Sequence, residues 1–360
     1  MIPLLYRPQA TTFPSTGLNA LCRLYDCIEC TVLEERNGIY EASFSYPLNG
    51  RNFEEIRLGR IIAIEHGSGN DLQPFDIVSY SRPIDGIVTF NCQHVSYRQS
   101  KIVVTTLGSN PTFASTVLQS IKTHGSPSNP FTYSTDLPSV ARVLPCADGI
   151  PKTAKSILGG TDGSLLDTFG GEFEWDKFAV KLHESRGTRK DFTIRYGVNM
   201  TDYLDEADYS ESYTAVVPYW SGTDENDQDV IVVGDLVDSG LESFNSRTEC
   251  IPLDLSGNFE TEPTTAELET FASSYITSNN INLPLQTITV NFLEDEDGIN
   301  VKKLHDCHLC DIINVQFPAY RMTGDFKIVK TEYDVLNDRF TTFELGALKT
   351  TLAQALGISK

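Results

Sequence analysis

Residues 58–64 read LGRIIAI and residues 75–78 read FDIV, while residues 309–315 read LCDIINV and residues 326–329 read FKIV. In each pair the phenylalanine lies 17 positions after the leucine. β-Branched and aromatic residues bounded by turn-forming residues are typical of strands. The chain therefore contains one pair of strands twice, which predicts an internal repeat of antiparallel β structure.

The repeat extends in both directions. A third run follows each pair, GIVTF at residues 86–90 and RFTTF at residues 339–343. Upstream, residues 40–46 and 213–219 share Tyr, Ala, an apolar residue and Tyr at every second position, the spacing of one strand face. The upstream strand precedes the repeated pair by 12 positions in the first copy and by 90 in the second. We predict two related β-domains, the second interrupted by an insertion of about 70–80 residues at a surface turn, where insertions cost little.

The alternative is that two β meanders look alike by chance. We favour the repeat because two blocks match in one order and one of them has identical internal spacing.

The predicted fold class is mainly β, with two similar antiparallel β-barrel domains and α+β parts. Short helical patterns and alternating strands predict a mixed α+β domain between the barrels. A capping box of Thr264 and Glu267 predicts one helix in the insertion, which we expect to pack against the mixed domain. The predicted parts are a first barrel at 1–100, the mixed domain at 101–190, a second barrel at 191–220 and 284–346, the insertion at 221–283, and a helical tail at 347–360.

One set of residues is predicted to face the barrel interiors or the sheet cores, because its members lie on apolar faces of the expected strands. It comprises Tyr40, Phe44, Ile61, Ile77 and Phe90 in the first barrel, and Tyr213, Val217, Ile312, Ile328 and Phe343 in the second.

The composition is strongly acidic. Asp and Glu number 49 against 28 Lys and Arg in 360 residues, a net charge of −21. This argues against sequence-specific nucleic-acid binding, which needs basic patches. It suits a surface that nucleic acid passes without adhering, although solubility alone also explains it. We expect no secretory signal and no membrane span, since no apolar run approaches 18 residues.

Two candidate metal sites are weak. Cys27 and Cys30 form one CxxC pair and Cys307 and Cys310 another, so four thiolates could hold zinc. The 276 residues between the pairs lie far outside zinc-ribbon spacing, so we expect free thiols. The acidic residues 224–235 are similar to a calcium loop but lack its glycine and its closing glutamate. We predict no metal and no cofactor.

Catalytic patterns are also missing from the sequence. It contains no nucleophile elbow and no HExxH motif, and the glycine-rich residues 159–164 lack the lysine of a phosphate-binding loop. We therefore predict no enzyme. Exposed aromatic residues could instead mark a carbohydrate-binding or receptor-binding surface, and the candidates are Trp175, Tyr219 and Trp220. At strand spacing such residues are more often core or interface residues.

Three longer stretches carry a resemblance to a known family. They are ILGGTDGSLLDTFGGEFEWD at residues 157–176, LHESRG at 182–187 and IRYGVNMT at 194–201. They are similar to the N-terminal hub region of tail-associated proteins of Gram-positive siphophages, labelled prophage endopeptidase tail or phage minor structural protein. The likeness covers essentially the whole chain.

The resemblance implies a structural role. The family resembles the baseplate hub of contractile tails, in which each chain has two similar barrels and three chains form a ring with pseudo-sixfold symmetry. The expected partners are two further copies of the chain, the distal tail protein ring, the tape-measure protein, and a separate receptor-binding or lysin protein. The expected location is the tail tip of the virion, after synthesis in the bacterial host cytoplasm, with a role in DNA ejection.

The family label also mentions an endopeptidase. In relatives this activity belongs to a C-terminal extension, and the present chain stops soon after the second predicted barrel. We therefore expect a non-enzymatic tail hub. A tail-associated cell-wall hydrolase and a receptor-binding module are the alternatives.

Overall fold

The computed structural model describes most of the chain. The described residues are 1–66, 72–82, 85–108, 112–161, 163–195, 200–208, 210, 212–223, 228–238, 247–259, 261–279, 281, 285–292, 306–317 and 322–347. Their architecture is mainly β, with one large curled sheet and small helical parts, as predicted. Among these residues, no helix combines the length and the apolar character needed to cross a membrane.

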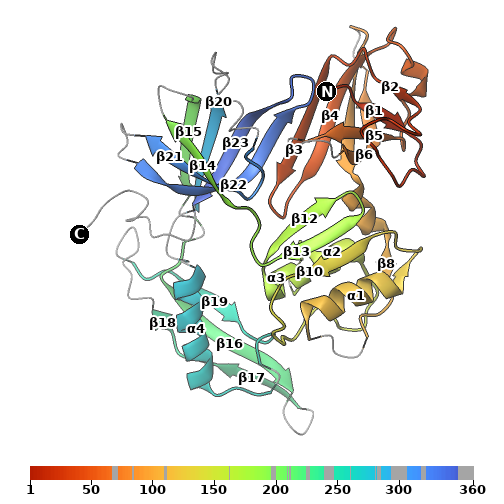
Figure 1. Ribbon diagram of the computed structural model, residues 1–360. Coiled ribbons are helices and arrows are strands. Elements are labelled where there is room, and N and C mark those ends of the chain that lie inside the picture. The colour runs from red at the N-terminus through yellow and green to blue at the C-terminus, as the bar shows by residue number, and fades with distance from the viewer. Residues whose placement is uncertain are drawn as a thin grey trace.

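The large sheet has thirteen strands and contains two six-stranded halves (Figure 1). We call them the first and second β-units. The first β-unit has the strand order β3-β4-β7-β6-β5-β1, and the short β2 (Cys22–Arg23) continues it beyond β1. Its strands are β1 (Leu4–Tyr6), β3 (Glu29–Glu35), β4 (Tyr40–Pro47), β5 (Ile61–Glu65), β6 (Leu72–Ser81) and β7 (Ile87–His94).

The second β-unit repeats this order as β15-β20-β23-β22-β21-β14. The two units differ at their last strand, because β14 runs parallel to β21 whereas β1 runs antiparallel to β5. The strands are β14 (Arg189–Arg195), β15 (Met200–Asp208), β20 (Leu285–Phe292), β21 (Ile312–Phe317), β22 (Met322–Asp334) and β23 (Arg339–Ala347).

The repeated pair of strands has the same register in both units. Ile62 lies opposite Phe75, and 251 positions later Ile313 lies opposite Phe326. A break in register follows Ile77 in β6 and Ile328 in β22, which again are 251 positions apart. A bulge of this kind bends a strand at a defined point. The two strand pairs whose spacing predicts the repeat therefore share both their register and their break in register.

The upstream half of the predicted repeat is wrong. The predicted repeat places residues 213–219 at the β4 position, which β20 occupies instead. The predicted stretch overlaps β16 (Ala215–Thr223), which belongs to a separate four-stranded sheet. An alternating pattern shows that one face of a strand is buried but does not show in which sheet.

The insertion consequently lies between β15 and β20, where the first β-unit has the tight turn at Asn37 and Gly38 between β3 and β4. Helix α4 (Thr265–Asn279) packs on β16, and its capping box is present: Thr264 N donates to Glu267 Oε2 over 2.8 Å. The other strands of this sheet are β17 (Asp229–Val233), β18 (Val237–Asp238) and β19 (Cys250–Asp254).

The mixed domain lies below the first β-unit in Figure 1 and has its own hydrophobic core. It touches the insertion, since Val143 N donates to Gly257 O over 3.2 Å. One sheet has the order β10-β13-β12 and the other β11-β8-β9. The elements are η1 (Phe53–Glu55) and η2 (Val95–Lys101) before this domain, and within it β8 (Val103–Val104), α1 (Ala114–His124), β9 (Gly125–Ser126), β10 (Thr132–Thr135), β11 (Lys152–Thr153), α2 (Ala154–Leu158), α3 (Leu165–Phe169), β12 (Glu172–Asp176) and β13 (Ala179–His183). The helical tail predicted at 347–360 lies outside the described residues beyond Ala347.

Candidate functional site

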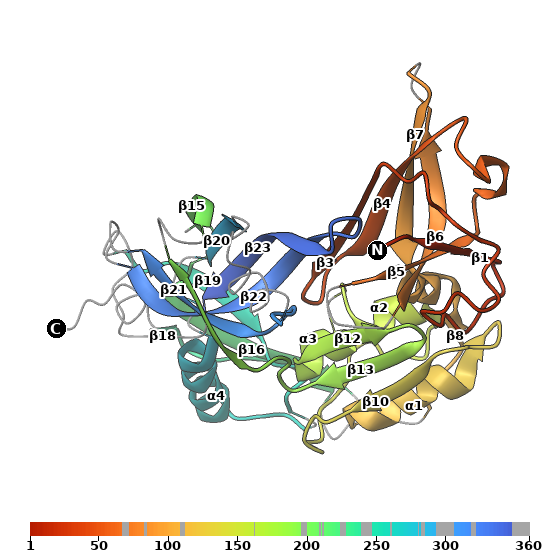
Figure 2. The ribbon, with the colours of Figure 1, turned by 45° about the horizontal axis from the view of Figure 1, so that its top comes forward.

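The two β-units are joined side by side by a pair of strands. Residues 330–334 of β22 pair with residues 31–35 of β3, antiparallel. Two further backbone bonds extend this joint: Arg36 N donates to Val329 O over 2.8 Å, and Val335 N donates to Cys30 O over 2.9 Å. The chain thus forms one continuous sheet across both units, which Figure 2 shows from a second direction.

A single hydrophobic cluster crosses this joint. It includes Val32 of the first unit and Tyr333 of the second, both fully buried. His66, which follows β5, packs edge-on against the Tyr333 ring with centroids 5.6 Å apart. Because one core serves both units, neither unit can rotate against the other without exposing apolar surface.

Most predicted core residues lie in this cluster, namely Tyr40, Phe44, Ile77, Phe90, Ile328 and Phe343. Ile61 is buried on the opposite face of β5, against Leu4 and Tyr6, and Ile312 is half-buried. Ile62 and Ile313 occupy the shared core instead. A run of apolar residues without alternation does not indicate which face is inside, so the sequence could not distinguish these neighbours.

Tyr213 and Val217 lie elsewhere. Tyr213 precedes β16 and Val217 lies within it, so neither belongs to the second β-unit, and both are half-buried. Their assignment to that unit is wrong, because an alternating pattern does not show to which sheet a strand belongs.

A buried ion pair connects the second β-unit to the mixed domain. Lys327 Nζ of β22 lies 2.7 Å from both carboxylate oxygens of Glu172 in β12, and both residues are buried. Glu172 also accepts hydrogen bonds from Arg186 N at 2.6 Å and from Arg36 Nη1 at 3.2 Å. Burial raises the pKa of Glu172, but the hydrogen bonds from Lys327 and Arg186 outweigh it and hold the pKa below its ordinary value. The carboxylate therefore fixes three segments around one point.

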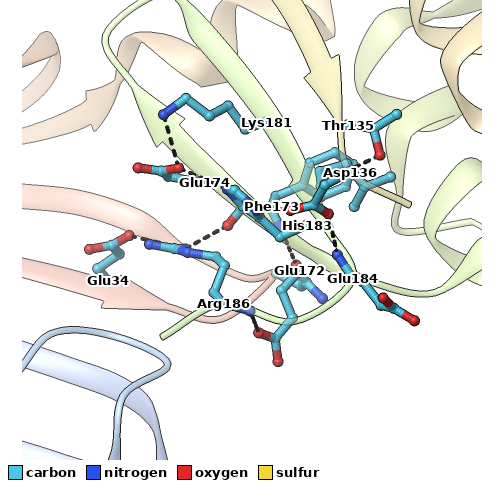
Figure 3. A network of polar contacts seen from close by, with 12 residues as sticks. Glu34, Thr135, Asp136, Glu172, Phe173, Glu174, Lys181, His183, Glu184 and Arg186 are labelled. Atoms are coloured by element: carbon cyan, nitrogen blue, oxygen red, sulfur yellow. Dashed lines mark hydrogen bonds and ion pairs between the residues drawn. The ribbon is translucent and has the colours of Figure 1, made fainter. Parts of the chain in front are cut away.

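Arg186 lies at the centre of this junction (Figure 3). Its Nη1 donates to Phe173 O over 2.6 Å and lies 4.0 Å from Glu34 Oε1 in β3. Glu34 is buried, and burial raises its pKa. Its other oxygen lies 3.4 Å from His66 Nδ1, and burial lowers the pKa of His66 to about 3, so the imidazole is neutral at physiological pH.

The next residue, Gly187, allows the chain to pass close to the second β-unit. Its φ is +79°, and a Cβ atom there would lie 2.0 Å from Cys310 O. Only glycine fits this approach. Directly afterwards Thr188 N donates to Asp311 Oδ1 over 2.7 Å, which anchors the start of β14.

One histidine is held between two carboxylates. His183 Nδ1 lies 2.8 Å from Asp136 Oδ2, and its Nε2 lies 2.9 Å from Glu174 Oε2 (Figure 3). Lys181 and the Glu184 backbone N–H also bond to these carboxylates, at 3.2 and 2.7 Å. Nucleophilic catalysis with a histidine base needs a hydroxyl or thiol within hydrogen-bond reach of the imidazole. Since both ring nitrogens are occupied by carboxylates, the arrangement ties β12, β13 and the end of β10 together.

A cavity of about 300 Å³ opens beside this histidine. Its charged groups bond to one another: Asp311 Oδ2 lies 3.2 Å from Lys190 Nζ and accepts from His308 N over 2.8 Å. The cavity is thus a polar seam between the mixed domain and the second β-unit. Its lining residues are Glu174, His183, Ser185, Arg186, Gly187, Lys190, His308, Leu309 and Asp311.

The sequence did not predict this junction. Lys327 lies between apolar neighbours on a strand, a pattern that ordinarily places the lysine on a solvated face. Glu172, Arg186 and Gly187 lie in the stretches that carry the resemblance, but no local pattern assigns them a role.

The two CxxC pairs lie at the start of β3 and directly before β21. Within the described part of the chain, no three His, Cys, Asp or Glu side chains are placed to hold a metal ion. Cys30 lies in β3 opposite Phe44, and Cys310 precedes β21. Residues 224–227 of the calcium-like loop lie outside the described residues.

Comparison with solved structures gives three whole-chain likenesses. The prophage tail protein gp18 from Listeria monocytogenes EGD-e is 14% identical, with a TM-score of 0.61 over 99% of this chain and 98% of that chain. The 43 kDa tail protein of prophage MuSo2 from Shewanella oneidensis is 8% identical, with a TM-score of 0.62 over 97% and 99%. The tail protein from Neisseria meningitidis MC58 is 9% identical, with a TM-score of 0.57 over 96% and 96%.

No protein-family model and no curated protein matches the sequence. The three structures nevertheless agree with the resemblance read from the sequence, and each spans almost the same length. The chain has the fold of phage tail proteins.

Proposed function

We propose that the protein is the structural hub of a phage or prophage-derived tail tip, in which three chains form a ring. The observation that carries the proposal is the pair of β-units with one strand order, joined side by side in one chain. Three such chains supply six similar units, so a threefold assembly presents a nearly sixfold surface. Closure of a ring through head-to-tail contacts is the ordinary outcome when the rotation between subunits closes.

In the proposed particle this ring joins the distal tail protein ring and lets the tape-measure protein and DNA pass. The likeness to tail proteins along the whole chain supports this role. The net charge of −21 is compatible with a passage to which DNA does not adhere.

A cell-wall hydrolase is the second candidate, and the described geometry favours it less. His183 has carboxylates at both nitrogens, and the lysine that donates to Ser185 Oγ over 3.1 Å, Lys327, is held as an ammonium by Glu172, so neither residue serves a hydroxyl as a base. We therefore assign the protein a non-enzymatic role. Incubation of the purified chain with bacterial cell walls should release no soluble fragments, and a steady release would contradict this assignment.

A carbohydrate-binding or receptor-binding role is supported even less. Trp220 is buried and donates from Nε1 to Phe259 O over 3.2 Å, while Trp175 stacks on Phe173 with ring centroids 5.1 Å apart. These rings stabilise packing, as aromatic residues at strand spacing commonly do.

The test of the hub is the mass of the purified chain by light scattering, followed by averaging of negative-stain images. We expect a particle of about 120 kDa, three times 40.0 kDa, with six lobes around a central hole. A chain that stays monomeric at every concentration measured would overturn the autonomous ring.

A further inference from the structure

One edge of strand β22 pairs with two different strands. Its residues 322–327 pair with β21, and its residues 330–334, beyond the bulge, pair with β3. The opposite edge pairs with β23. The far half of β22 is therefore the part that attaches the second β-unit to the first.

The corresponding part of β6 lacks such a neighbour. Residues 72–76 pair with β5, and the opposite edge pairs with β7 as far as Ser81. Within the described strands, nothing pairs with the β5-side edge of residues 79–81. Exposure reflects this difference: Thr331 in β22 is 1% exposed, whereas Tyr80, 251 positions earlier in β6, is 43% exposed. Val78 beside it is 44% exposed.

The other half of the joint is also duplicated. β3 pairs with β4 on one edge and with β22 on the other. Its counterpart β15 pairs with β20 on one edge, and no described strand pairs with the other edge. On β15, Leu204 is 52% exposed and Glu206 is exposed. Among the described strands, each chain therefore carries one paired copy of this joint and a second copy of each of its two sides with which no strand pairs.

We infer that β6 of one chain pairs with β15 of the next chain in the register with which β22 pairs with β3 inside the chain. The inference rests on the proposed ring and specifies its contact. The register follows from the third strands: Phe44 lies opposite Phe90, and Val290 lies opposite Phe343. Within the chain, Glu332 lies opposite Leu33, and the corresponding residues are Ser81 of one chain and Glu206 of the next. Tyr333 lies opposite Val32 within the chain, and the corresponding residues are Arg82 of one chain and Asp205 of the next.

Charge agrees with this partner. β15 reads MTDYLDEAD, which has four acidic residues and no basic one. The free end of β6 presents Arg82, whose guanidinium lies 4.4 Å above the centre of the exposed Tyr80 ring. Opposite charges facing each other across strands stabilise a pair, whereas two acidic edges would repel. The pairing also removes exposed strand edges, which otherwise promote uncontrolled aggregation.

The test is a disulfide between chains. In the double variant Ser81→Cys/Glu206→Cys the two Cα atoms would be about 4.5–5.5 Å apart, within reach of a disulfide. Mild oxidation should link the chains into covalent trimers, seen on a non-reducing gel and reversed by reductant. Both positions are exposed in the single chain, so folding should not suffer. The matched control is Ser81→Cys/Asp202→Cys, which is displaced by four residues, about 13 Å, along the same face. The single variants Ser81→Cys and Glu206→Cys show how much cross-linking the native cysteines contribute.

The outcomes separate the pairing from the ring. A trimer in light scattering together with disulfides only in the 81–206 variant supports both. A trimer without that disulfide, or with equal linking in the control, overturns the pairing and leaves the ring in place. A monomer without disulfides overturns both. As an independent readout, Arg82→Glu should raise the dissociation constant of the trimer about tenfold or more, and adding Asp205→Arg should restore it. An unchanged constant in Arg82→Glu would contradict the register.

Discussion

At the scale of single residues, Cys310 shows how the repeat constrains a position. Its N–H donates to Ile328 O over 2.8 Å, as Gly59 N donates to Ile77 O over 2.8 Å in the first β-unit. Gly59 has a φ of +80° and Cys310 one of +73°. A side chain in this left-handed conformation costs about 1–2 kcal/mol, which the turn imposes because the strand register requires it. Both β-units thus keep the same left-handed turn, with glycine in the first and cysteine in the second.

A charge placed in the shared core should prevent folding. Ile328 is fully buried, so Ile328→Asp would bury an unpaired carboxylate and lower the free energy of unfolding by about 3–5 kcal/mol. We expect loss of soluble protein, measured by the soluble fraction after expression and by circular dichroism. The matched control is Ile231→Asp on β17, where the side chain is 69% exposed and the change should be tolerated. A soluble Ile328→Asp variant with normal unfolding would show that this strand position is not a core position.

Acid should destabilise the fold through a buried histidine. His94 accepts at Nδ1 from Ser96 N over 3.3 Å, and burial lowers its pKa from 6.5 to about 3. Between these values the unfolded chain binds a proton that the folded chain does not, so the free energy of unfolding falls as the pH falls. The slope from this residue is about 1.4 kcal/mol per pH unit.

His94→Asn tests this assignment. The asparagine oxygen can still accept from Ser96 N but does not titrate, so urea unfolding between pH 6.5 and about 4 should lose that part of the slope. The slope from His66 should remain, since burial also lowers its pKa to about 3. An unchanged slope in His94→Asn would show that His94 is protonated in the folded chain.

At the scale of elements, the Lys327–Glu172 pair fixes β22 against β12. Lys327→Met would leave the Glu172 carboxylate buried without its main partner and lower the free energy of unfolding by about 3 kcal/mol. The double variant Lys327→Met/Glu172→Gln should recover much of this loss, because it also removes the unpaired charge. Urea unfolding at neutral pH distinguishes the two, and equal losses would mean that the pair is not coupled.

The stabilisation by the Lys327–Glu172 pair should decrease in acid. The folded pKa of Glu172 lies below its ordinary value of 4.5, so its contribution is present above 4.5 and is lost as the pH falls through the lower folded value. The difference between wild type and Lys327→Met should therefore shrink in that range.

The elements also show how far the sequence predicts the fold. The strands β5, β6 and β21, β22 were predictable because spacing and composition repeat together, and even their register follows. The position of β16 was not predictable, because alternation reports burial and not the identity of the neighbouring strand. The junction around Glu172, Arg186 and Lys327 was not predictable either. It joins residues more than a hundred positions apart, and no local pattern encodes such a meeting.

At the scale of the whole molecule, the two β-units behave as one body. They share one hydrophobic cluster and one sheet, and the mixed domain is bound to both through Glu172, which contacts Arg36 beside the first unit and Lys327 in the second. In the proposed ring the angle between the units within a chain is thus set before assembly. Three of the six joints of the proposed ring lie within the chains. Three further joints between neighbouring chains would close the ring.

The insertion between β15 and β20 has a further consequence. The first β-unit connects the equivalent strands by the four residues 36–39, whereas the second carries a folded module of its own at that hairpin. In a ring of three chains, every alternate unit would bear this module. An electron-dense or fluorescent tag fused within the module would label three of the six units. An image of the ring would then show threefold and not sixfold symmetry.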